Sequence, residues 1–135
     1  MDLDQARDYL RQNHRAVLAT MRRDGTPQMS PVACAVNSDG DVVVSSRETA
    51  IKTKNVLRDP RAWLCVFPDS FFGGFVQVEG DVTVVSLPEA MDGLVDYYRN
   101  VAGEHPDWDD YRSAMVKDRR LVLSFTVDHA YGFTW

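Results

Sequence analysis

The sequence predicts a small antiparallel β-barrel with flanking helices, mainly β in class. Two Asp-Gly pairs, Asp24-Gly25 and Asp39-Gly40, lie between apolar strand-like runs, and Asp-Gly supplies the positive φ that tight hairpin turns need. Segment 75–85 alternates apolar and polar residues except at Gly80, where we expect a bulge or a sharp bend. Short antiparallel strands joined by turns, with one long coiled strand, are typical of a small barrel.

Six strands are expected, each an apolar or alternating run bounded by a turn or a helix signal. They cover residues 16–21, 28–36, 42–46, 62–67, 75–85 and 121–127. Run 62–67 is almost continuously apolar, as in a strand covered on both faces.

Four helices are expected from capping and stop signals. The first covers 4–13, and the second begins at an N-cap on Thr49 and stops before Asp59-Pro60. The third opens with a capping box formed by Ser86 and Glu89 and ends at Gly103. A short fourth helix follows residues 106–110 and continues through 115.

Length and composition restrict the class of protein. A chain of 135 residues fits one domain, residues 1–135, with a real core. No run approaches the ~20 apolar residues of a membrane span, and the N-terminus is acidic where a signal peptide is basic, so we expect a cytoplasmic protein without a membrane partner. A net charge of −5 with interspersed acids and bases argues against nucleic-acid binding. Cys34 and Cys65 lie in apolar runs without metal-ligand spacing, so we expect buried thiols and no metal site.

The helix start that follows strand 42–46 is the strongest candidate for a binding site. The first N–H groups of a helix lack intrahelical partners, and the helix dipole adds partial positive charge there, so a helix start attracts anions. Donor side chains surround this start: Ser45, Ser46, Thr49, Lys52, Thr53 and Lys54. Helical spacing puts Leu57 on the packed side and Lys52 and Asn55 on the opposite side. A solvated helix with solubilising lysines fits the same spacing, and the chain has no Walker or Rossmann motif.

Three motifs, with the order of the elements, resemble a known family. They are Gly-Thr-Pro-Gln-Met-Ser-Pro at 25–31, Lys-Thr-Lys-Asn at 52–55 with Asp-Pro-Arg-Ala at 59–62, and the long segment 98–112. The chain resembles the split-barrel flavin-binding proteins related to pyridoxamine 5'-phosphate oxidase, and within them the actinobacterial group that uses the deazaflavin coenzyme F420. The resemblance covers nearly the whole chain and implies a six-stranded antiparallel split β-barrel that forms a homodimer.

The resemblance also implies a function and a site. It implies an oxidoreductase that passes hydride between F420 and a small unsaturated or carbonyl substrate, with the cofactor in the cleft between two barrels. Lys52 and its neighbours would hold the cofactor phosphate, and residues 28–31 would lie beside the ring, with Ser45 and Ser46 nearby. The assigned cofactor-binding residues are Gln28, Met29, Ser30, Pro31, Ser45, Ser46, Lys52, Thr53, Lys54, Asn55 and Phe75. No catalytic residue is assigned, because hydride transfer needs a ring held at a dry, shaped site more than an acid or a base from the protein.

Three departures from the family pattern bear on this site. Ala50 stands where relatives often have an arginine, so one phosphate contact is either missing or supplied by Arg47 or Lys54. Gly73-Gly74 stands where relatives can carry an aromatic residue, which leaves Phe75 as the candidate for ring stacking. The sequence ends without the Arg-rich C-terminal segment that true pyridoxamine phosphate oxidases use on their substrate, so oxidation of vitamin B6 is not expected.

Aromatic residues are candidates for the cleft walls, although in so small a domain such residues usually serve the core or an interface. Trp63, Trp108 and Tyr111 are the candidates, whereas Tyr97 and Tyr98 are interpreted as helix packing.

Two other functions stay open from the sequence. The same cleft fits an oxidoreductase that uses FMN, and it fits a non-catalytic protein that binds or stores a flavin or deazaflavin. The long anionic tail of the deazaflavin rewards cations that FMN never reaches, so relative affinity distinguishes the two cofactors. Reduction of a substrate panel distinguishes an enzyme from a storage protein.

Overall fold

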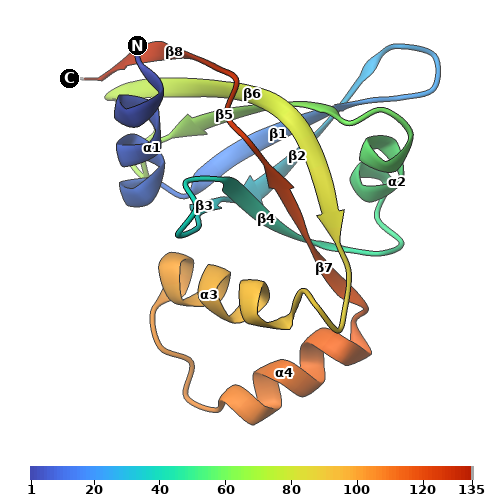
Figure 1. Ribbon diagram of the computed structural model, residues 1–135. Coiled ribbons are helices and arrows are strands. Elements are labelled where there is room, and N and C mark those ends of the chain that lie inside the picture. The colour runs from blue at the N-terminus through green and yellow to red at the C-terminus, as the bar shows by residue number, and fades with distance from the viewer. Residues whose placement is uncertain (135) are drawn as a thin grey trace.

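The computed structural model of the chain describes residues 1–134 and contains one antiparallel sheet flanked by helices (Figure 1). Its eight strands are β1 Arg15–Met21, β2 Pro27–Ala33, β3 Ala35–Val36, β4 Val42–Arg47, β5 Arg61–Phe67, β6 Gly74–Val85, β7 Arg120–Phe125 and β8 His129–Thr134. Its helices are α1 Leu3–Gln12, α2 Ile51–Arg58, α3 Met91–Ala102 and α4 Trp108–Lys117. The strands follow the order β2-β1-β5-β6-β7-β4-β3, and β8 pairs with β6. The expected class, mainly β and antiparallel with flanking helices, is confirmed.

The expected count of six strands is wrong. The predicted strand 28–36 divides at Cys34, whose N–H donates to the carbonyl of His14 at 2.9 Å. As a result β2 pairs with β1, whereas β3 pairs with β4. β8 lies beyond the predicted set because Ala130 is its single buried residue, which leaves no alternation for a sequence pattern to detect.

The sheet curls around its core because its two ends are neighbours in the chain. β2 and β3 end the path of paired strands, and only Cys34 separates them. Inward-facing side chains such as Leu18, Leu64 and Leu123 are at most 1% exposed and pack in one core. Leu10 of α1 belongs to the same core, so this helix covers an opening of the curled sheet.

β6 is the long bent strand that the alternation predicted, and Gly80 lies at its bend. Its first part pairs with β5 and β8, and its last part pairs with β7. Val82 is opposite Phe125, whereas Glu79 is opposite His129, so the segment between β7 and β8 carries one more residue than β6 does there. A Cβ atom on Gly80 would lie 2.0 Å from the carbonyl oxygen of Thr126. The irregularity expected at Gly80 is therefore present, with the extra residue on the opposing segment.

Several of the expected helix starts are wrong. α4 begins at Trp108, inside the segment 106–110 that was expected to precede it. α2 has Ala50 as its N-cap, with no side-chain hydrogen bond, instead of Thr49. α3 begins after Ala90, because residues 87–90 first form a turn in which the Ala90 N–H donates to the carbonyl of Ser86. The expected C-terminus of α3 is confirmed, since Gly103 caps it with a φ of 84°. Of residues 1–134, no helix is long and apolar enough to cross a membrane.

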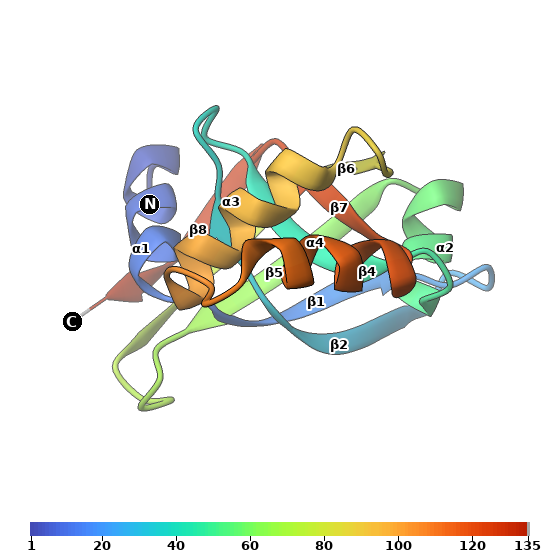
Figure 2. The ribbon, with the colours of Figure 1, turned by 90° about the horizontal axis from the view of Figure 1, so that it is seen from below.

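α3 and α4 cover the outer face of one part of the sheet. Val43 of β4 and Val122 of β7 point outward and pack with Leu94, Val95 and Tyr111 of the two helices. Figure 1 shows both helices below the sheet, and the view from below in Figure 2 shows them lying across it side by side. This packing creates the second, smaller core of the protein.

The outer face of the other part of the sheet is rich in aromatic residues, interspersed with Gln77 and Glu79 of β6, and is left uncovered within this chain. Trp63, Cys65 and Phe67 point outward from β5 and are half-buried. The expectation that run 62–67 is covered on both faces is therefore met on one face only. Both thiols were expected to be buried. Cys34 is fully buried, whereas Cys65 points to this uncovered face and is only half-buried. Tyr131 and Phe133 of β8 extend the face, and both stack edge-on against Phe75.

Candidate functional site

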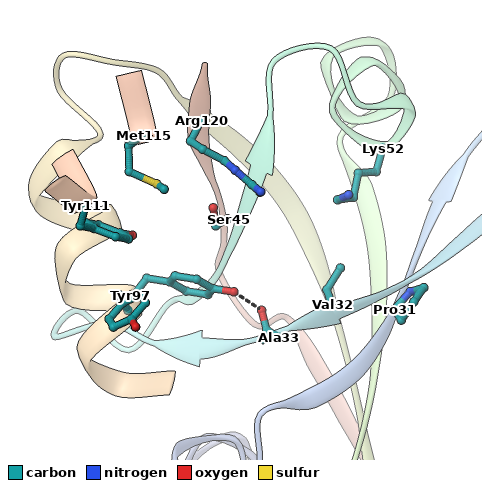
Figure 3. A pocket seen from close by; sticks show the side chains of 10 residues that line it. Pro31, Val32, Ala33, Ser45, Lys52, Tyr97, Tyr111, Met115 and Arg120 are labelled. Carbon is teal, nitrogen blue, oxygen red and sulfur yellow. Dashed lines mark hydrogen bonds between the residues drawn. The ribbon is translucent and has the colours of Figure 1, made fainter. Parts of the chain in front are cut away.

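Lys52 lies in the first turn of α2 and faces a cavity of about 490 Å³ between the sheet and α3–α4 (Figure 3). The cavity is lined by Pro31, Val32, Ala33, Ser45, Lys52, Tyr97, Tyr98, Tyr111, Met115 and Arg120. β2 supplies one wall, β4 and β7 supply the back, and the helices supply an aromatic wall. The structure thus brings together three of the predicted residues, Pro31, Ser45 and Lys52, from three separate elements.

The charge of this cavity is positive. Its lining contains Lys52 and Arg120 and no acidic residue. Burial, and then the positive charges of Arg120 and Arg47, lower the pKa of Lys52. Within residues 1–134 the Lys52 amino group has no hydrogen bond or ion pair. An amino group that is partly desolvated and faces other cations favours the arrival of an anion.

Two tyrosines fix the aromatic wall through hydrogen bonds to main-chain carbonyls. Tyr97 donates to Ala33 at 2.9 Å, which ties α3 to β2, and Tyr111 donates to Leu94 at 2.8 Å, which ties α4 to α3. Burial raises the pKa of Tyr97, and it raises the pKa of Tyr111 to about 12. Both hydroxyls therefore hold their protons in structural bonds, and they shape the cavity instead of serving as acids or bases.

Three predicted donors turn into the protein instead of toward the cavity. Ser46 and Thr53 are buried, and their hydroxyls bond to each other at 2.8 Å. Thr53 also donates to the carbonyl of Arg47 at 2.7 Å. Asn55 is buried as well and donates to Thr20 at 3.1 Å. These side chains hold α2 against β1 and β4, and their polar groups bond within the chain instead of facing the cavity.

The predicted phase of α2 is correspondingly wrong at two positions. Asn55 was expected on the solvent side but is buried. Its amide donates to Thr20 and accepts from Arg58, so both of its polar atoms are satisfied there. Leu57, expected on the packed side, is 66% exposed. Lys54 is exposed and lines a different cavity of about 420 Å³, together with Arg22, Arg23 and Arg58.

The predicted β2 residues alternate between the two faces of the strand. Met29 and Pro31 share the outward face, and Gln28 and Ser30 share the inward face. Met29 is 66% exposed, and Pro31 also lines the edge of the cavity. Gln28 accepts a hydrogen bond from Thr20 at 3.3 Å. Ser30 carries a buried hydroxyl that has no hydrogen-bond partner within residues 1–134. The polar groups of this strand are therefore only partly satisfied by the chain itself.

Phe75 is not part of the Lys52 cavity. It lines a separate apolar cavity of about 300 Å³ on the outer face, together with Cys65, Phe67 and the aromatic loop 71–72. No residue lines both cavities. Within one chain, the predicted ring-stacking role of Phe75 is therefore separated from the predicted phosphate site.

The sequence did not point to Arg120, and the helix packing expected of Tyr97 and Tyr98 is present but is not their only role. Arg120 opens β7 and reaches the cavity because β7 pairs with β4, where Arg120 stands opposite Arg47. No local pattern marks such a pairing. Tyr97 and Tyr98 line the cavity in addition to packing α3, whereas Tyr111 lines it as expected. Arg47 and Lys54 were the candidates for the missing arginine contact; Lys54 faces away, and Arg47 pairs with Asp118 at 3.8 Å.

Comparison with solved structures shows the same fold. A conserved hypothetical protein, Rv2991 of Mycobacterium tuberculosis, matches with a TM-score of 0.81 and 21% identity, over 99% of this chain and 85% of that one. A protein described as an F420 reductase matches with a TM-score of 0.71 and 18% identity, over 92% and 94%. A NimC/NimA family protein from Clostridium acetobutylicum matches with a TM-score of 0.70 and 17% identity, over 98% and 88%.

The family comparison agrees with the fold and with the position of the cavity. Residues 3–133 match the family model described as pyridoxamine 5'-phosphate oxidase. That range includes every residue of the Lys52 cavity and every strand of the sheet except the last residue of β8, Thr134. The chain belongs to the pyridoxamine 5'-phosphate oxidase family.

Proposed function

We propose that this protein is an oxidoreductase that passes hydride between coenzyme F420 and a small unsaturated or carbonyl substrate. The observation that carries the proposal is the unpaired amino group of Lys52, which faces β2 and Ser45 across a cavity that has no acidic residue. A half-buried cation without a counter-ion fits the phosphate of a flavin-type cofactor. The match to the family and the similar fold of an F420 reductase support the same reading.

The residues present fit such a cofactor in charge and in shape. Lys52 would hold the phosphate, and Pro31 and the neighbouring β2 residues would lie beside the ring. When bound, the deazaflavin supplies a carrier that accepts or donates hydride. The protein's own contribution is to hold the ring and to exclude water, and Tyr98, Met115 and Val32 give the cavity apolar surface for that purpose.

A second cluster of cations favours F420 over FMN. Arg22, Arg23, Lys54 and Arg58 line the cavity on the other side of α2, where one acidic residue, Asp24, accompanies them. The anionic tail of F420 extends beyond the phosphate, whereas FMN ends there. A tail that follows α2 would meet these cations, and FMN would not reach them.

We further propose that the cofactor lies between two copies of the chain, each a split barrel. The uncovered outer face of β1, β2, β5, β6 and β8 carries Met29, Trp63, Cys65, Phe67 and Phe133. A face this rich in aromatic and aliphatic side chains is typical of a surface that another molecule covers. A second copy packed there would also bring aromatic residues that one chain keeps apart from Lys52.

Fluorescence titration of the purified protein with F420 and with FMN tests the proposal. We expect saturable binding of F420, with FMN binding more weakly, followed by oxidation of reduced F420 when an accepted unsaturated or carbonyl compound is added. Tighter binding of FMN would favour the FMN-dependent alternative. Binding without turnover on a broad panel would favour a storage protein, and failure to bind either cofactor would refute the proposed site.

A further inference from the structure

Arg120 reaches the Lys52 cavity from the opposite side of the site. It is the first residue of β7 and follows α4 after a short turn. Figure 3 shows its side chain projecting from β7 into the space between Lys52 and the aromatic wall. Arg120 also borders a second cavity behind β7, so its side chain separates the two spaces.

The Nε atom of Arg120 is buried without a hydrogen-bond partner within residues 1–134. The side chain as a whole is 27% exposed. The ion-pair partner of Arg120 is Asp118, whose Oδ2 lies 3.7 Å from Nε, too far for a hydrogen bond. The same Oδ2 lies 3.8 Å from Arg47, so one carboxylate stands between two arginines. The chain therefore leaves this group short of negative charge and of acceptors.

A partly buried guanidinium with an unpartnered Nε is under-satisfied by the described part of the chain itself. The terminal nitrogens of an arginine present a planar set of donors that matches two oxygens of a phosphate or a carboxylate. Lys52 faces the same cavity, and Arg120 contributes to the depression of its pKa, as expected for two cations that share one space. A negative group placed between them would relieve both charges.

We propose that Arg120 and Lys52 together bind one oxyanion, a phosphate or a carboxylate group, and that Arg120 contacts it directly. The proposal deepens the proposed function and rests on it for the nature of the ligand. Two sources supply the same chemistry: the cofactor's own phosphate, or an acid group on the substrate. Arg120 would then be the cation that stands in place of the arginine that Ala50 lacks, supplied by a strand that is distant in the sequence.

Arg120→Gln tests this, with Arg112→Gln as the matched control. Arg112 is exposed on α4 outside the cavity, and like Arg120 it has one acidic neighbour, Asp109 at 4.0 Å. Each substitution removes one positive charge, so the two variants have the same net charge. Affinity for inorganic phosphate is measured by calorimetry, and affinities for FMN and riboflavin by fluorescence, because riboflavin lacks the phosphate. We expect Arg120→Gln to weaken the binding of inorganic phosphate by about 10- to 100-fold and Arg112→Gln to leave it unchanged.

The titrations with FMN and riboflavin identify the source of the oxyanion. If Arg120→Gln weakens FMN but not riboflavin, the site takes the cofactor's phosphate. A second outcome is that Arg120→Gln leaves the affinity for FMN unchanged, while inorganic phosphate binds the FMN-loaded parent but not the FMN-loaded variant. The site then takes the acid group of a second molecule. Arg120→Lys keeps the charge but not the fork, so it should recover only part of the affinity in either case.

Failure of this proposal is distinct from failure of the proposed function. If the parent binds neither F420 nor FMN, the redox function fails, and loss of phosphate binding in Arg120→Gln still supports the oxyanion site. If Arg120→Gln behaves like Arg112→Gln toward phosphate, FMN and riboflavin, or if the parent neither binds phosphate nor prefers FMN to riboflavin, the oxyanion site is refuted. A lower melting temperature of ligand-free Arg120→Gln with unchanged affinities would assign Arg120 to a structural role beside Asp118.

Discussion

Lys52 and Lys54 stand two positions apart on α2 and face different cavities, so they should affect cofactor binding differently. Lys52→Ala removes a charge-assisted contact to the phosphate, which F420 and FMN both carry. Such contacts are worth roughly 1.5–3 kcal/mol. We expect affinities for F420 and for FMN to fall by about 10- to 100-fold. Lys54→Ala should weaken F420 alone, because FMN does not extend to that cavity.

Fluorescence titration of both variants with both cofactors measures these affinities. The melting temperature without cofactor serves as the control and should barely change, because neither lysine has an ion pair within residues 1–134. Unchanged affinity of Lys52→Ala for both cofactors would place the phosphate elsewhere.

The two thiols should differ in reactivity because their exposure differs. Burial raises the pKa of Cys34 to about 12, and burial also raises the pKa of the half-buried Cys65. A thiol reagent attacks the thiolate, so a raised pKa slows both reactions at neutral pH and the rates should rise with pH. We expect Cys65 to be labelled before Cys34 in the folded protein, as followed by mass spectrometry. Labelling of Cys34 first would contradict the position of the β2–β3 junction.

At the scale of elements, the bend in β6 depends on the absence of a side chain at Gly80. Gly80→Ala would place a Cβ against the Thr126 carbonyl, and overpacking of this kind costs roughly 1–3 kcal/mol or more. Gly93→Ala is the control, because the methyl group on α3 would lie 3.5 Å from Val122, an ordinary contact. Alanine there should stabilise the helix by about 0.5–1 kcal/mol.

Urea unfolding of both variants measures the difference. Equal stability of Gly80→Ala and the parent would show that β6 and the segment after β7 separate more easily than the close approach indicates.

Sequence patterns predict those elements whose signals are local. The Asp-Gly turns, the alternation of β6 and the Gly103 stop each depend on a few consecutive residues, and each is present in the structure. The orientation of α2 depends instead on Thr20, which is 35 positions from the Asn55 that it bonds. Lys52 was predictable as a site residue because the signal of a helix start is local. Arg120 was not predictable, because its place in the cavity follows from the pairing of β7 with β4.

At the scale of the whole molecule, the uncovered outer face predicts a homodimer. We expect sedimentation of the parent as a dimer at micromolar concentration, because the aromatic and aliphatic side chains of this face are otherwise left in water. Met29→Glu places a charge on that face without disturbing the core, and it should weaken the dimer by about tenfold or more.

Val116→Glu is the matched control, since Val116 is similarly exposed but lies on α4, away from the outer face. A parent that sediments as a monomer would leave the proposed cleft without its second wall. Dissociation by Val116→Glu instead of Met29→Glu would place the dimer contact on the helical side.

The curling of the sheet also sets the time at which the cavity comes into existence during synthesis. Its lining runs from Pro31 to Arg120, and its two walls belong to opposite ends of the strand path. A nascent chain that has released only β1 to β6 has the lysine and the β2 wall but neither α4 nor the arginine. Since chains emerge from the ribosome N-terminus first, a ligand of the complete cavity cannot select the fold until β7 has emerged. A cofactor would thus stabilise the finished protein without guiding the earlier steps of its folding.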